Sequence, residues 1–449
     1  MELITLERVL AQLRTLLEAG DFAAASALID GLHAVDQAAV VGKLEEAAQV
    51  ALMPRLDPAD SADILEEMEE HQAADLAAFL STDMLIRIVD EMEPDEAADL
   101  LGDIRPEQAQ AVLDGLEDPD EVRPLLLHAD DTAGGLMTSE YVALRRRMTA
   151  RAALDVIRSV KPAAENMYDL FIVDGHGRLA GVLTLRELVL AEPSALVGDL
   201  MDTEVISVPV GSDQEACARL MLRYDLLALP VVDEQRRLVG VITIDDVADV
   251  LEAEATEDIQ RFGGAEPLEK PYLDTAITLV TRKRIGWLLL LFVTESLTGS
   301  VLRHFGSELD AVVVLTFFIP LLIGTGGNAG SQTTSTIIRA LAIGDITGHD
   351  ALRAFWHELR IGILLGVAMA GVAYGRALLW GTSPSVAATV SLAILSIVLW
   401  ANALGALLPL AASWAGVDPT VVSGPAMSTL VDATGLFIYL TIARILLGL

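Results

Sequence analysis

The stretch S428-TLVDATGLFIYLTIARIL-L447 has the length and the apolar character of a helix that crosses a membrane. It carries one carboxylate, Asp432, near its middle. A charged carboxylate at the centre of a bilayer costs about 2.5–3.5 kcal/mol on insertion scales, so its presence there indicates a function. Arg444 lies about three turns away, roughly 18 Å along the helix, which is too far for an ion pair. Asp432 is therefore the first candidate functional residue.

Four further apolar segments precede this stretch after residue 282, and each is long enough to cross about 30 Å of hydrocarbon. Basic residues cluster before the first segment and around the loop between the second and third. This asymmetry predicts a cytoplasmic N-terminal part and a C-terminus outside. We expect a multi-pass protein of the plasma or inner membrane, surrounded by lipid, with spans at about 285–304, 311–340, 356–380, 386–413 and 420–447.

The charge is divided unequally along the chain. The formal net charge is −35, yet from Arg282 onward eight acidic residues stand against nine basic ones. The first 281 residues hold 57 acidic and 21 basic residues, a net charge of −36. Such a surplus repels nucleic acid and favours cations, because close carboxylates destabilise a compact domain unless they are neutralised. We therefore expect cations, and no nucleic acid, as partners.

Cysteine usage and the N-terminus both fit a cytoplasmic start. The single Cys217 excludes an intrachain disulfide and is typical of a reducing compartment. The N-terminal MELITLERVLAQL is amphipathic and acidic, and it lacks the basic segment and apolar core of a signal peptide.

The acidic part begins with a repeat of twelve residues. Each unit opens with a polar or proline-bearing turn and closes with a short apolar helix, which predicts a solenoid of stacked helices. The units start at residues 57, 69, 81, 93 and 105 and read DPADSADILEEM, EEHQAADLAAFL, STDMLIRIVDEM, EPDEAADLLGDI and RPEQAQAVLDGL.

A longer repeat follows. F171-IVDGHGRLAGVLTLREL-L188 aligns with P230-VVDEQRRLVGVITIDDV-V247, and each copy predicts a strand, an Asp-containing turn, a second strand and a helix after Thr184 or Thr243. Each copy also has an upstream Leu-Met pair. This pattern resembles a tandem CBS domain, which in other proteins often binds adenosine nucleotides or cations. A purely structural dimerisation module is the alternative.

Between the second copy and the membrane, A248-DVLEAEATEDIQRFGG-G264 has helical spacing of its apolar residues, acidic residues around them, and a Gly263-Gly264 ending. Such a helix either transmits motion from the acidic part to the membrane or serves as a spacer.

The second span, I319-PLLIGTGGNAGSQTTS-S335, is unusual for a membrane helix. Its proline and glycines weaken a helix, which lipid does not tolerate unless protein or water satisfies the backbone. Thr325, Asn328 and Gln332 follow helical spacing and share one face. This polar stripe predicts a lined pore, and close helix packing at the small pair Gly326 and Gly330 is the alternative, which is compatible with a pore.

These features resemble the MgtE family of magnesium channels and transporters, and the resemblance covers essentially the whole chain. PLLIGTGGNAGSQ matches the signature of the family in the second span, and residues of the fourth and fifth spans match as well. The matching or pore-lining positions are Pro320, Gly324, Gly327, Asn328, Gly330, Gln332, Asn402, Pro409, Gly424, Pro425, Ser428 and Asp432. The chain departs from the family at Gly424, where Asn is frequent, and at Ser428, where Ala is common.

The resemblance implies a multi-domain fold: an all-α helical-repeat domain (1–134), an α/β tandem CBS domain (135–199 and 200–247), a connecting helix (248–270) and an all-α transmembrane domain of five helices (271–449). It also implies a homodimer, whose second and fifth spans line one pore, with Asp432, Asn328 and Gln332 facing Mg²⁺.

The resemblance further assigns cytosolic Mg²⁺-sensing ligands, each of which could instead be a solvated surface carboxylate. They are Asp63, Asp95, Asp99, Asp213, Glu215, Asp225, Asp246, Asp249, Glu254, Glu257, Asp258 and Asp418. A weaker correspondence places an ATP site at Phe171, Arg186 and Leu226, where this chain has Glu187 and Leu226 in place of the expected Asp and aromatic residue.

Together these observations predict a Mg²⁺-selective uptake channel that intracellular Mg²⁺ closes. The alternative is a secondary carrier of divalent cations, coupled to protons or sodium, with Asp432 and Glu295 as a relay. Glu295 lies within the first span, where an outer pore role and an ion pair with Arg376 or Arg444 are both open. An enzyme is not expected, because the spans contain no HExxH, no GxSxG and no cysteine nucleophile.

Overall fold

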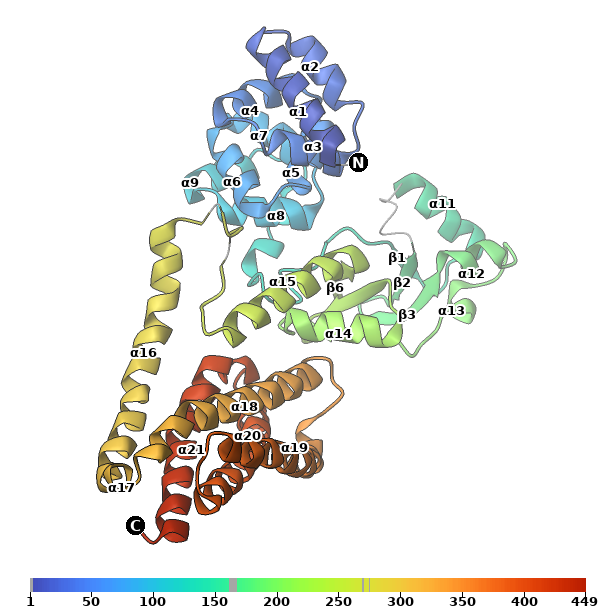
Figure 1. Cartoon of the computed structure of the whole chain (residues 1–449). Helices are drawn as coiled ribbons and strands as arrows, with labels where there is room; N and C mark the ends of the chain where they lie inside the picture. Colours follow the sequence, from blue (N-terminus) through green and yellow to red (C-terminus); the bar gives the residue numbers. More distant parts are fainter. Residues whose placement is uncertain (1–2, 161–167, 269, 274) are drawn as a thin grey trace. The chain divides into compact units, whose positions relative to one another are not determined.

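The computed structural model describes residues 3–160, 168–268, 270–273 and 275–449. The chain divides into two compact units, Met1–Glu252 and Ala253–Leu449. Figure 1 shows that the first unit contains short helices and two small sheets, whereas the second contains long helices. Each unit is described by itself.

The first unit begins with a stack of short helices. They are α1 (Leu3–Glu18), α2 (Phe22–Ile29), α3 (Ala34–Val41), α4 (Glu46–Leu52), η1 (Met53–Arg55), α5 (Pro58–Glu66), α6 (Glu70–Phe79), α7 (Thr82–Val89), α8 (Pro94–Asp103), α9 (Pro106–Leu113), α10 (Pro119–Val122) and η2 (Leu125–Leu127).

The twelve-residue repeat sets the boundaries of α5 to α9. Asp57, Glu69, Ser81, Glu93 and Arg105 are the N-caps of these five helices, and each is the first residue of a predicted unit. The Asp57 and Ser81 side chains accept hydrogen bonds from the backbone of the first turn, which satisfies donors that a helix start leaves free. Each helix of the repeat packs mainly on the helix two places along the chain, as α5 does on α7 and α6 on α8, so the repeat predicts the solenoid correctly.

Two similar α/β modules follow, built from two sheets of three strands. Within each sheet the first strand runs parallel to the second, and the second runs antiparallel to the third. The elements are β1 (Ala143–Arg145), α11 (Ala150–Val160), β2 (Asp169–Val173), β3 (Leu179–Thr184), α12 (Leu185–Leu190), α13 (Val197–Leu200), β4 (Val208–Pro209), α14 (Gln214–Tyr224), β5 (Ala228–Val232) and β6 (Leu238–Thr243).

The predicted helix starts after Thr184 and Thr243 are confirmed. The Thr184 hydroxyl accepts a hydrogen bond from Glu187 N, and Glu187 bonds back to Thr184, which makes a capping box. After Thr243, helix α15 (Ile244–Phe262) begins earlier than the connecting helix expected from residue 248. Gly264, with a φ of +75°, follows the end of α15, as the Gly-Gly pair predicts.

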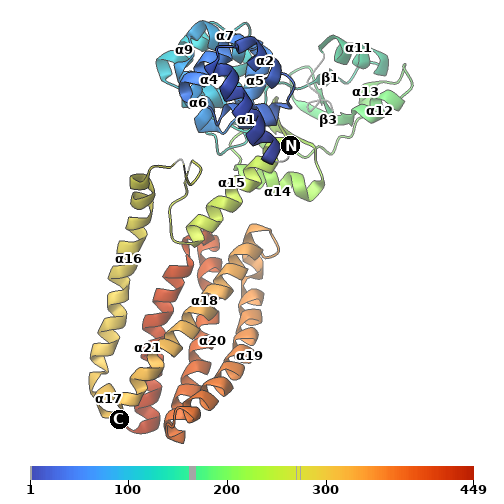
Figure 2. The same cartoon turned by 45° about the horizontal axis from the view of Figure 1, so that its top comes forward.

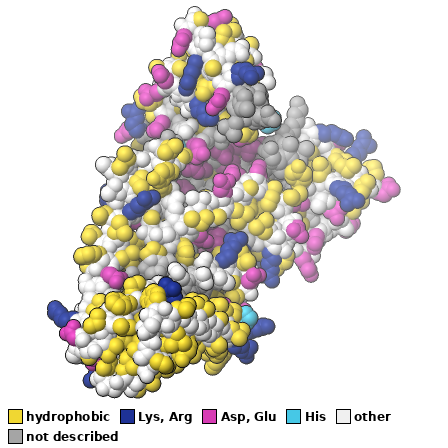
Figure 3. Space-filling model, viewed as in Figure 1, with side chains coloured by type: hydrophobic (Ala, Val, Ile, Leu, Met, Phe, Trp, Pro, Cys, Tyr) yellow, Lys and Arg dark blue, Asp and Glu magenta, His cyan; other side chains and the backbone are white. Residues whose placement is uncertain are grey.

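The second unit contains five helices long and apolar enough to cross a membrane. Its elements are α16 (Ile277–His304), α17 (Gly306–Ala311), η4 (Val313–Phe318), α18 (Ile319–Ala342), η5 (Gly348–Asp350), α19 (Ala351–Leu379), α20 (Pro384–Trp414), η6 (Pro419–Val421) and α21 (Gly424–Leu447). Figure 2 shows the long helices running side by side, and Figure 3 shows hydrophobic side chains covering their visible face. The predicted fold class is thereby confirmed.

Two helix starts differ from the apolar segments read from the sequence. Helix α16 begins at Ile277, ahead of the basic residues 282–284, because a helix continues past the apolar part that lipid covers. The second segment begins with the 3₁₀ turns of η4, and α18 starts at Ile319 with Pro320 in its first turn. Proline fits there because the first turn does not need its N–H.

Helix α20 is the core of the membrane unit. It packs on α18, α19 and α21, while α16 packs mainly on α21. The buried side chains at its centre include Ile394, Ile397 and Val398. Two of the long helices, α18 and α21, therefore have one face on a common core and another face free.

Candidate functional site

The predicted polar stripe lies on the free face of α18. Asn328 and Gln332 are exposed, one helical turn apart, and Thr325 is half-buried beside them. Gly326 and Gly330 of the same helix face the packed side. A methyl group on Gly326 would lie 2.5 Å from Ile397 Cγ2, and one on Gly330 would lie 2.9 Å from Met427 Cε. The two interpretations of this segment are thus compatible, since close packing on one face accompanies a polar stripe on the other.

Asp432 lies on α21 next to that helix and is half-buried. A methyl group on Gly327 would lie 3.6 Å from Asp432 Oδ1 and 3.2 Å from Ser428 Oγ. Gly327 therefore lets the carboxylate approach the backbone of α18. Within the described part of the chain, Asp432 forms no ion pair. Its carboxylate is free to face a cation.

Glu295 is exposed on α16, and its charge interacts with that of Asp432. Both arginines considered as partners are engaged elsewhere. Arg376 stacks over Trp380 with its Cζ 4.6 Å from the ring centroid, and Arg444 Nε lies 3.6 Å from Glu308 Oε1. Ser307 and Arg444 hold the pKa of Glu308 below its usual value. Glu295 therefore belongs to the surroundings of Asp432 and not to an arginine pair.

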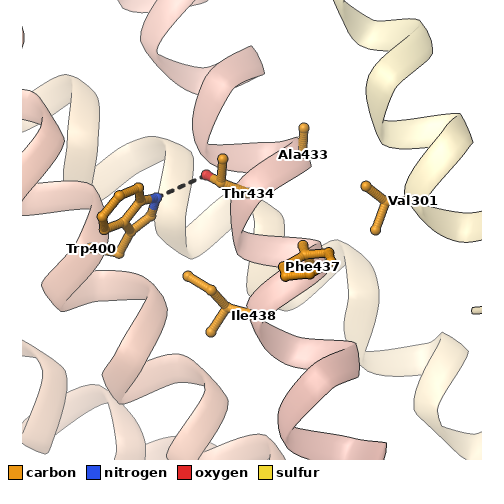
Figure 4. Close-up of a pocket in the computed structure, with 6 residues that line it drawn as sticks. All are labelled: Val301, Trp400, Ala433, Thr434, Phe437 and Ile438. Atoms are coloured by element: carbon orange, nitrogen blue, oxygen red, sulfur yellow. Dashed lines mark hydrogen bonds between the residues drawn. The ribbon is translucent and has the colours of Figure 1, made fainter.

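A pocket of about 460 Å³ lies one turn beyond Asp432, between α16, α20 and α21. Val301, Trp400, Ala433, Thr434, Phe437 and Ile438 line it, as Figure 4 shows. Its polar groups are satisfied internally, because Trp400 Nε1 donates a hydrogen bond of 2.9 Å to Thr434 Oγ1. The lining of this pocket is mainly apolar, so the pocket does not suit a cation.

The start of α21 is held by the end of α15. Asp418 accepts hydrogen bonds from Thr420 and a charge-assisted bond of 2.5 Å from Arg261 Nη1. Arg261 also pairs with Glu257 one turn earlier. Burial raises the pKa of Asp418, but the hydrogen bonds from Thr420 and Arg261 lower it by more. The pKa of Asp418 therefore lies below its usual value. Two predicted sensor residues thus share a guanidinium that the sequence did not single out.

The two departures from the family pattern, Gly424 and Ser428, lie in the same region. A methyl group on Gly424 would lie 3.4 Å from the ring of Phe262, the last residue of α15. Ser331 Oγ lies 3.2 Å from Gly424 O and 3.3 Å from Ser428 Oγ, which joins α18 to α21. The ring of Phe262 therefore packs against Gly424, and Ser428 takes part in an interhelical hydrogen bond.

In the first unit, the fold gathers several of the predicted sensor residues between α8 and the start of α15. Asp95 is 7% exposed, its pKa is raised by burial, and its Oδ1 has no hydrogen-bond partner within the described residues. Burial is the main cause that raises the pKa of Asp246 to about 7, and the negative charge of Asp95 is the next. Asp99 is exposed at the edge of this group, and desolvation of its carboxyl together with the charge of Glu70 raises its pKa to about 7. We call Asp95, Glu96, Asp99 and Asp246 the acidic cluster.

Sequence reasoning missed Glu96 of this cluster. Burial and then the charges of Asp95, Asp99 and Asp246 raise the pKa of Glu96 to about 9. The signal was its place on α8, since residues 95, 96 and 99 of a helix lie within one turn. In the described part of the chain, no three acidic, His or Cys side chains are arranged to hold a metal ion directly.

The other predicted residues lie apart from the cluster. Asp213 caps α14 through Ala216 N, and Glu215 forms an ion pair with Arg219. Asp225 ends α14 in the left-handed conformation, with a φ of 52°. Burial and neighbouring acids raise the pKa values of Asp249 and of Asp258, whose acidic neighbours are Asp418, Glu254 and Glu257.

Two more predicted positions fall elsewhere again. Asp63 is exposed on α5, near Glu66. Pro409 is buried within α20.

The residues of the weaker ATP correspondence are not gathered into one place. Phe171 is 2% exposed and packs with Val173 and Val241 between the two modules. Leu226 packs against a different core, and Arg186 is exposed on α12.

Comparison with known proteins matches each part of the chain. Residues 319–442 match a divalent cation transporter family, MgtE; residues 32–131 match the MgtE intracellular N domain; and residues 133–194 and 197–253 match the CBS domain. The magnesium transporter MgtE of Thermus thermophilus is 45% identical over 327 residues, which cover 73% of this chain and 72% of that protein. That of Enterococcus faecalis is 34% identical over 328 residues, with 73% and 72% covered.

Solved structures match the first part. The cytosolic domain of the Mg²⁺ channel MgtE in complex with ATP is 37% identical, with a TM-score of 0.51, and covers 54% of this chain and 99% of its own. The soluble part of a magnesium transporter is 32% identical, also with a TM-score of 0.51, and covers 56% and 99%. From these relatives and from the order of its parts, the chain belongs to the MgtE family of divalent cation transporters.

Proposed function

We propose that this protein transports Mg²⁺ across a membrane as a selective channel, and that intracellular Mg²⁺ closes it. The observation that carries the proposal is Asp432, a carboxylate without an ion pair among the described residues of the membrane unit, beside the polar stripe of α18. The magnesium transporters of related sequence support Mg²⁺ as the substrate.

The proposed ion pathway uses two copies of the chain. In a homodimer with α18 and α21 at its axis, two Asp432 carboxylates repel each other unless a cation lies between them. Mg²⁺ gives up its water reluctantly and prefers six oxygen ligands. Two carboxylates, with Asn328 and Gln332 nearby, hold such an ion through its own waters and avoid the energy of stripping it. Carboxylate repulsion and hydrated binding together favour a divalent cation.

The proposed orientation places the first unit, which contains the acidic cluster, in the cytoplasm. Basic residues lie near the start of α16, at residues 282–284, and around the loop between α18 and α19, which are on the cytoplasmic side by the charge rule. An odd number of spans then puts the end of α21 outside. In this orientation the acidic cluster senses the Mg²⁺ concentration inside the cell.

The proposed gating follows from the charge of the acidic cluster. Without a counter-ion, Asp95, Glu96 and Asp246 repel one another, and this favours separation of α8 from the start of α15. Hydrated Mg²⁺ neutralises them and favours the closed arrangement. Several weak sites acting together supply the several kcal/mol that a sharp population shift requires.

Single-channel recording of the purified full-length protein in a bilayer tests the transport proposal. We expect unitary Mg²⁺ currents, and a loss of divalent selectivity in Asp432→Asn. Asp310→Asn, which changes an exposed acid outside the spans, is the matched control and should behave as the wild type. Unaltered selectivity in Asp432→Asn would refute the assigned role of this residue.

Limited proteolysis tests the gating proposal. Millimolar Mg²⁺ should slow digestion of residues 1–270 in the full-length protein, and Asp95→Asn should weaken that protection. Equal ionic strength from KCl is the control for screening. Digestion that is indifferent to Mg²⁺ would sink the gating proposal while leaving transport untouched.

The carrier alternative draws on one observation, the interaction of the exposed Glu295 with Asp432. Two carboxylates at membrane depth are what a proton-coupled relay uses. A carrier gives saturable, pH-dependent flux without unitary currents, so the same recordings decide between the two.

ATP binding to the CBS pair is a separate hypothesis. It is supported by the ATP complex of the related cytosolic domain. Titration calorimetry of the full-length protein with ATP tests it, and Arg186→Ala should weaken binding because Arg186 is an exposed cation at the predicted place. Absence of heat at millimolar ATP would remove the hypothesis.

A further inference from the structure

Three buried polar side chains meet inside the membrane unit, away from Asp432. Thr333 of α18 is 5% exposed, Glu358 of α19 is 7% exposed and Asn402 of α20 is 1% exposed. Thr333 Oγ1 lies 2.8 Å from Asn402 Oδ1 and 3.4 Å from Glu358 Oε2. The three residues therefore join three helices at one point.

The hydrogen bonds of this group do not balance as they stand. The hydroxyl of Thr333 has one proton, yet two acceptor oxygens lie within reach. At the same time, Asn402 Nδ2 is buried and lacks a partner among the described residues. An asparagine amide is oriented by its hydrogen-bond network, and turning it by half a revolution exchanges its oxygen and nitrogen. In that orientation Nδ2 donates to Thr333 Oγ1, and Thr333 donates its proton to Glu358.

We propose that Asn402, Thr333 and Glu358 form a directional hydrogen-bond relay, and that Thr333 and Glu358 act through it as positioning residues for the ion pathway. The relay gives one N–H of the buried amide a partner and leaves the amide oxygen without a donor, and unpaired carbonyl oxygens are less rare in proteins than unpaired N–H groups. The proposal rests on the transport function proposed for α18 and names what holds that helix.

The helices around the relay are shaped to receive it. Gly362 follows Glu358 by one turn, and a methyl group there would lie 2.7 Å from the amide atom of Asn402 that is the nitrogen before the amide is turned and the oxygen after it. Any other residue at 362 would push α20 and its amide away from α19. The close approach is therefore a second feature that holds Asn402 in place.

The relay acts on the polar stripe because Thr333 is the neighbour of Gln332. On the other side of Gln332, Ser331 bonds to Gly424 O and to Ser428 of α21. Consecutive residues of a helix point about 100° apart, so Ser331 and Thr333 anchor α18 from two directions. Rotation of α18 about its axis is thereby restricted, and Gln332 stays on the free face.

The test removes the hydroxyl while keeping the size of the side chain. Thr333→Val in the full-length protein should reduce Mg²⁺ flux by about tenfold, as expected for the loss of a hydrogen bond to a charged group. Thr333→Ser restores the hydroxyl and should stay within about twofold of the wild type. Thr389→Val is the matched control, because Thr389 is fully buried but bonds only to Ser385 O of its own helix. It should leave the flux unchanged.

Glu358 offers an independent route if Thr333→Val fails to fold. Glu358→Gln keeps the size and an acceptor oxygen and should resemble the wild type, whereas Glu358→Leu should lose flux as Thr333→Val does. The double variant Thr333→Val/Asn402→Leu should transport no less Mg²⁺ than Thr333→Val alone, because both substitutions interrupt the same relay.

A readout other than flux checks positioning directly. In a protein whose Cys217 is replaced by alanine, Gln332→Cys reports the exposure of the free face through its rate of modification by a charged thiol reagent. Thr333→Val should change this rate and Thr389→Val should not. The proposal is overturned if Thr333→Val transports as the wild type, if serine fails to rescue it, if Thr389→Val is equally impaired, or if the modification rate of position 332 is unchanged. A wild-type protein that transports no Mg²⁺ would overturn the transport proposal instead.

Discussion

Glu96→Gln is expected to stabilise the first unit in the absence of Mg²⁺, because it removes an ionisable carboxyl from the acidic cluster. Burial and four neighbouring acids raise the pKa of Glu96 from 4.5 to about 9. A carboxyl whose pKa is raised by folding opposes folding wherever the unfolded chain would ionise it. This penalty is absent below pH 4.5, grows as the pH rises, and is complete near pH 9.

The magnitude follows from the same shift. One pKa unit corresponds to about 1.36 kcal/mol, so ionisation linkage at pH 8 opposes folding by at most about 5 kcal/mol. Glu96 is only half-buried, and its charge is coupled to those of its neighbours, which lowers the figure. We expect Glu96→Gln to raise the free energy of unfolding by about 1–3 kcal/mol at pH 8 and by less than about 1 kcal/mol at pH 5.

Urea denaturation of residues 1–252, followed by circular dichroism, measures this difference. Structures of related cytosolic domains have been solved on their own, so the fragment is a reasonable sample. Glu91→Gln is the control, because Glu91 is exposed on the same domain and should change stability by less than about 0.5 kcal/mol. Saturating Mg²⁺ should stabilise the wild type more than Glu96→Gln. An equal stabilisation at pH 5 and pH 8 would refute ionisation as the cause, and no stabilisation at pH 8 would refute the crowding of charge.

Two further predictions concern the membrane unit. Gly326→Ala should destabilise the protein by about 1–3 kcal/mol, because the added methyl would lie 2.5 Å from Ile397 Cγ2. Gly371→Ala is the control: its methyl meets nothing within 4 Å, so it should be neutral or slightly stabilising. Thermal unfolding in detergent compares the two variants, and equal midpoints would contradict the packing. If Mg²⁺ closes the protein as proposed, Arg261→Gln should raise the Mg²⁺ concentration that half-inhibits transport by about fivefold, since the partly exposed pair with Asp418 contributes about 1 kcal/mol. Arg261→Gln/Asp418→Asn should return toward the wild type, because both charges are then gone, and a double variant as impaired as the single one would count against the pair.

Much of the architecture was readable from local patterns. The five apolar helices follow from the length of their apolar segments, and the solenoid follows from an N-cap at every twelfth residue. The two α/β modules follow from a strand and turn that occur twice. The N-caps at Asp57 and Ser81 illustrate why, since a cap depends on the next few residues alone. Helix starts near charged residues were less readable, as Ile277 shows, because hydropathy reports the lipid-covered part of a helix and not its end.

What the sequence determined by itself was the presence of Asp432 in a membrane-length helix, the polar stripe of α18 and the surplus of acid before the first span. These are properties of composition and spacing. The tertiary structure alone decided which groups meet: Arg261 with Asp418, Glu96 with Asp246, and Thr333 with Glu358 and Asn402. Such meetings join residues far apart in the chain, and they depend on how helices pack on one another. Local periodicity sets which face of a helix is apolar, but only the packed core decides which side chain stands opposite.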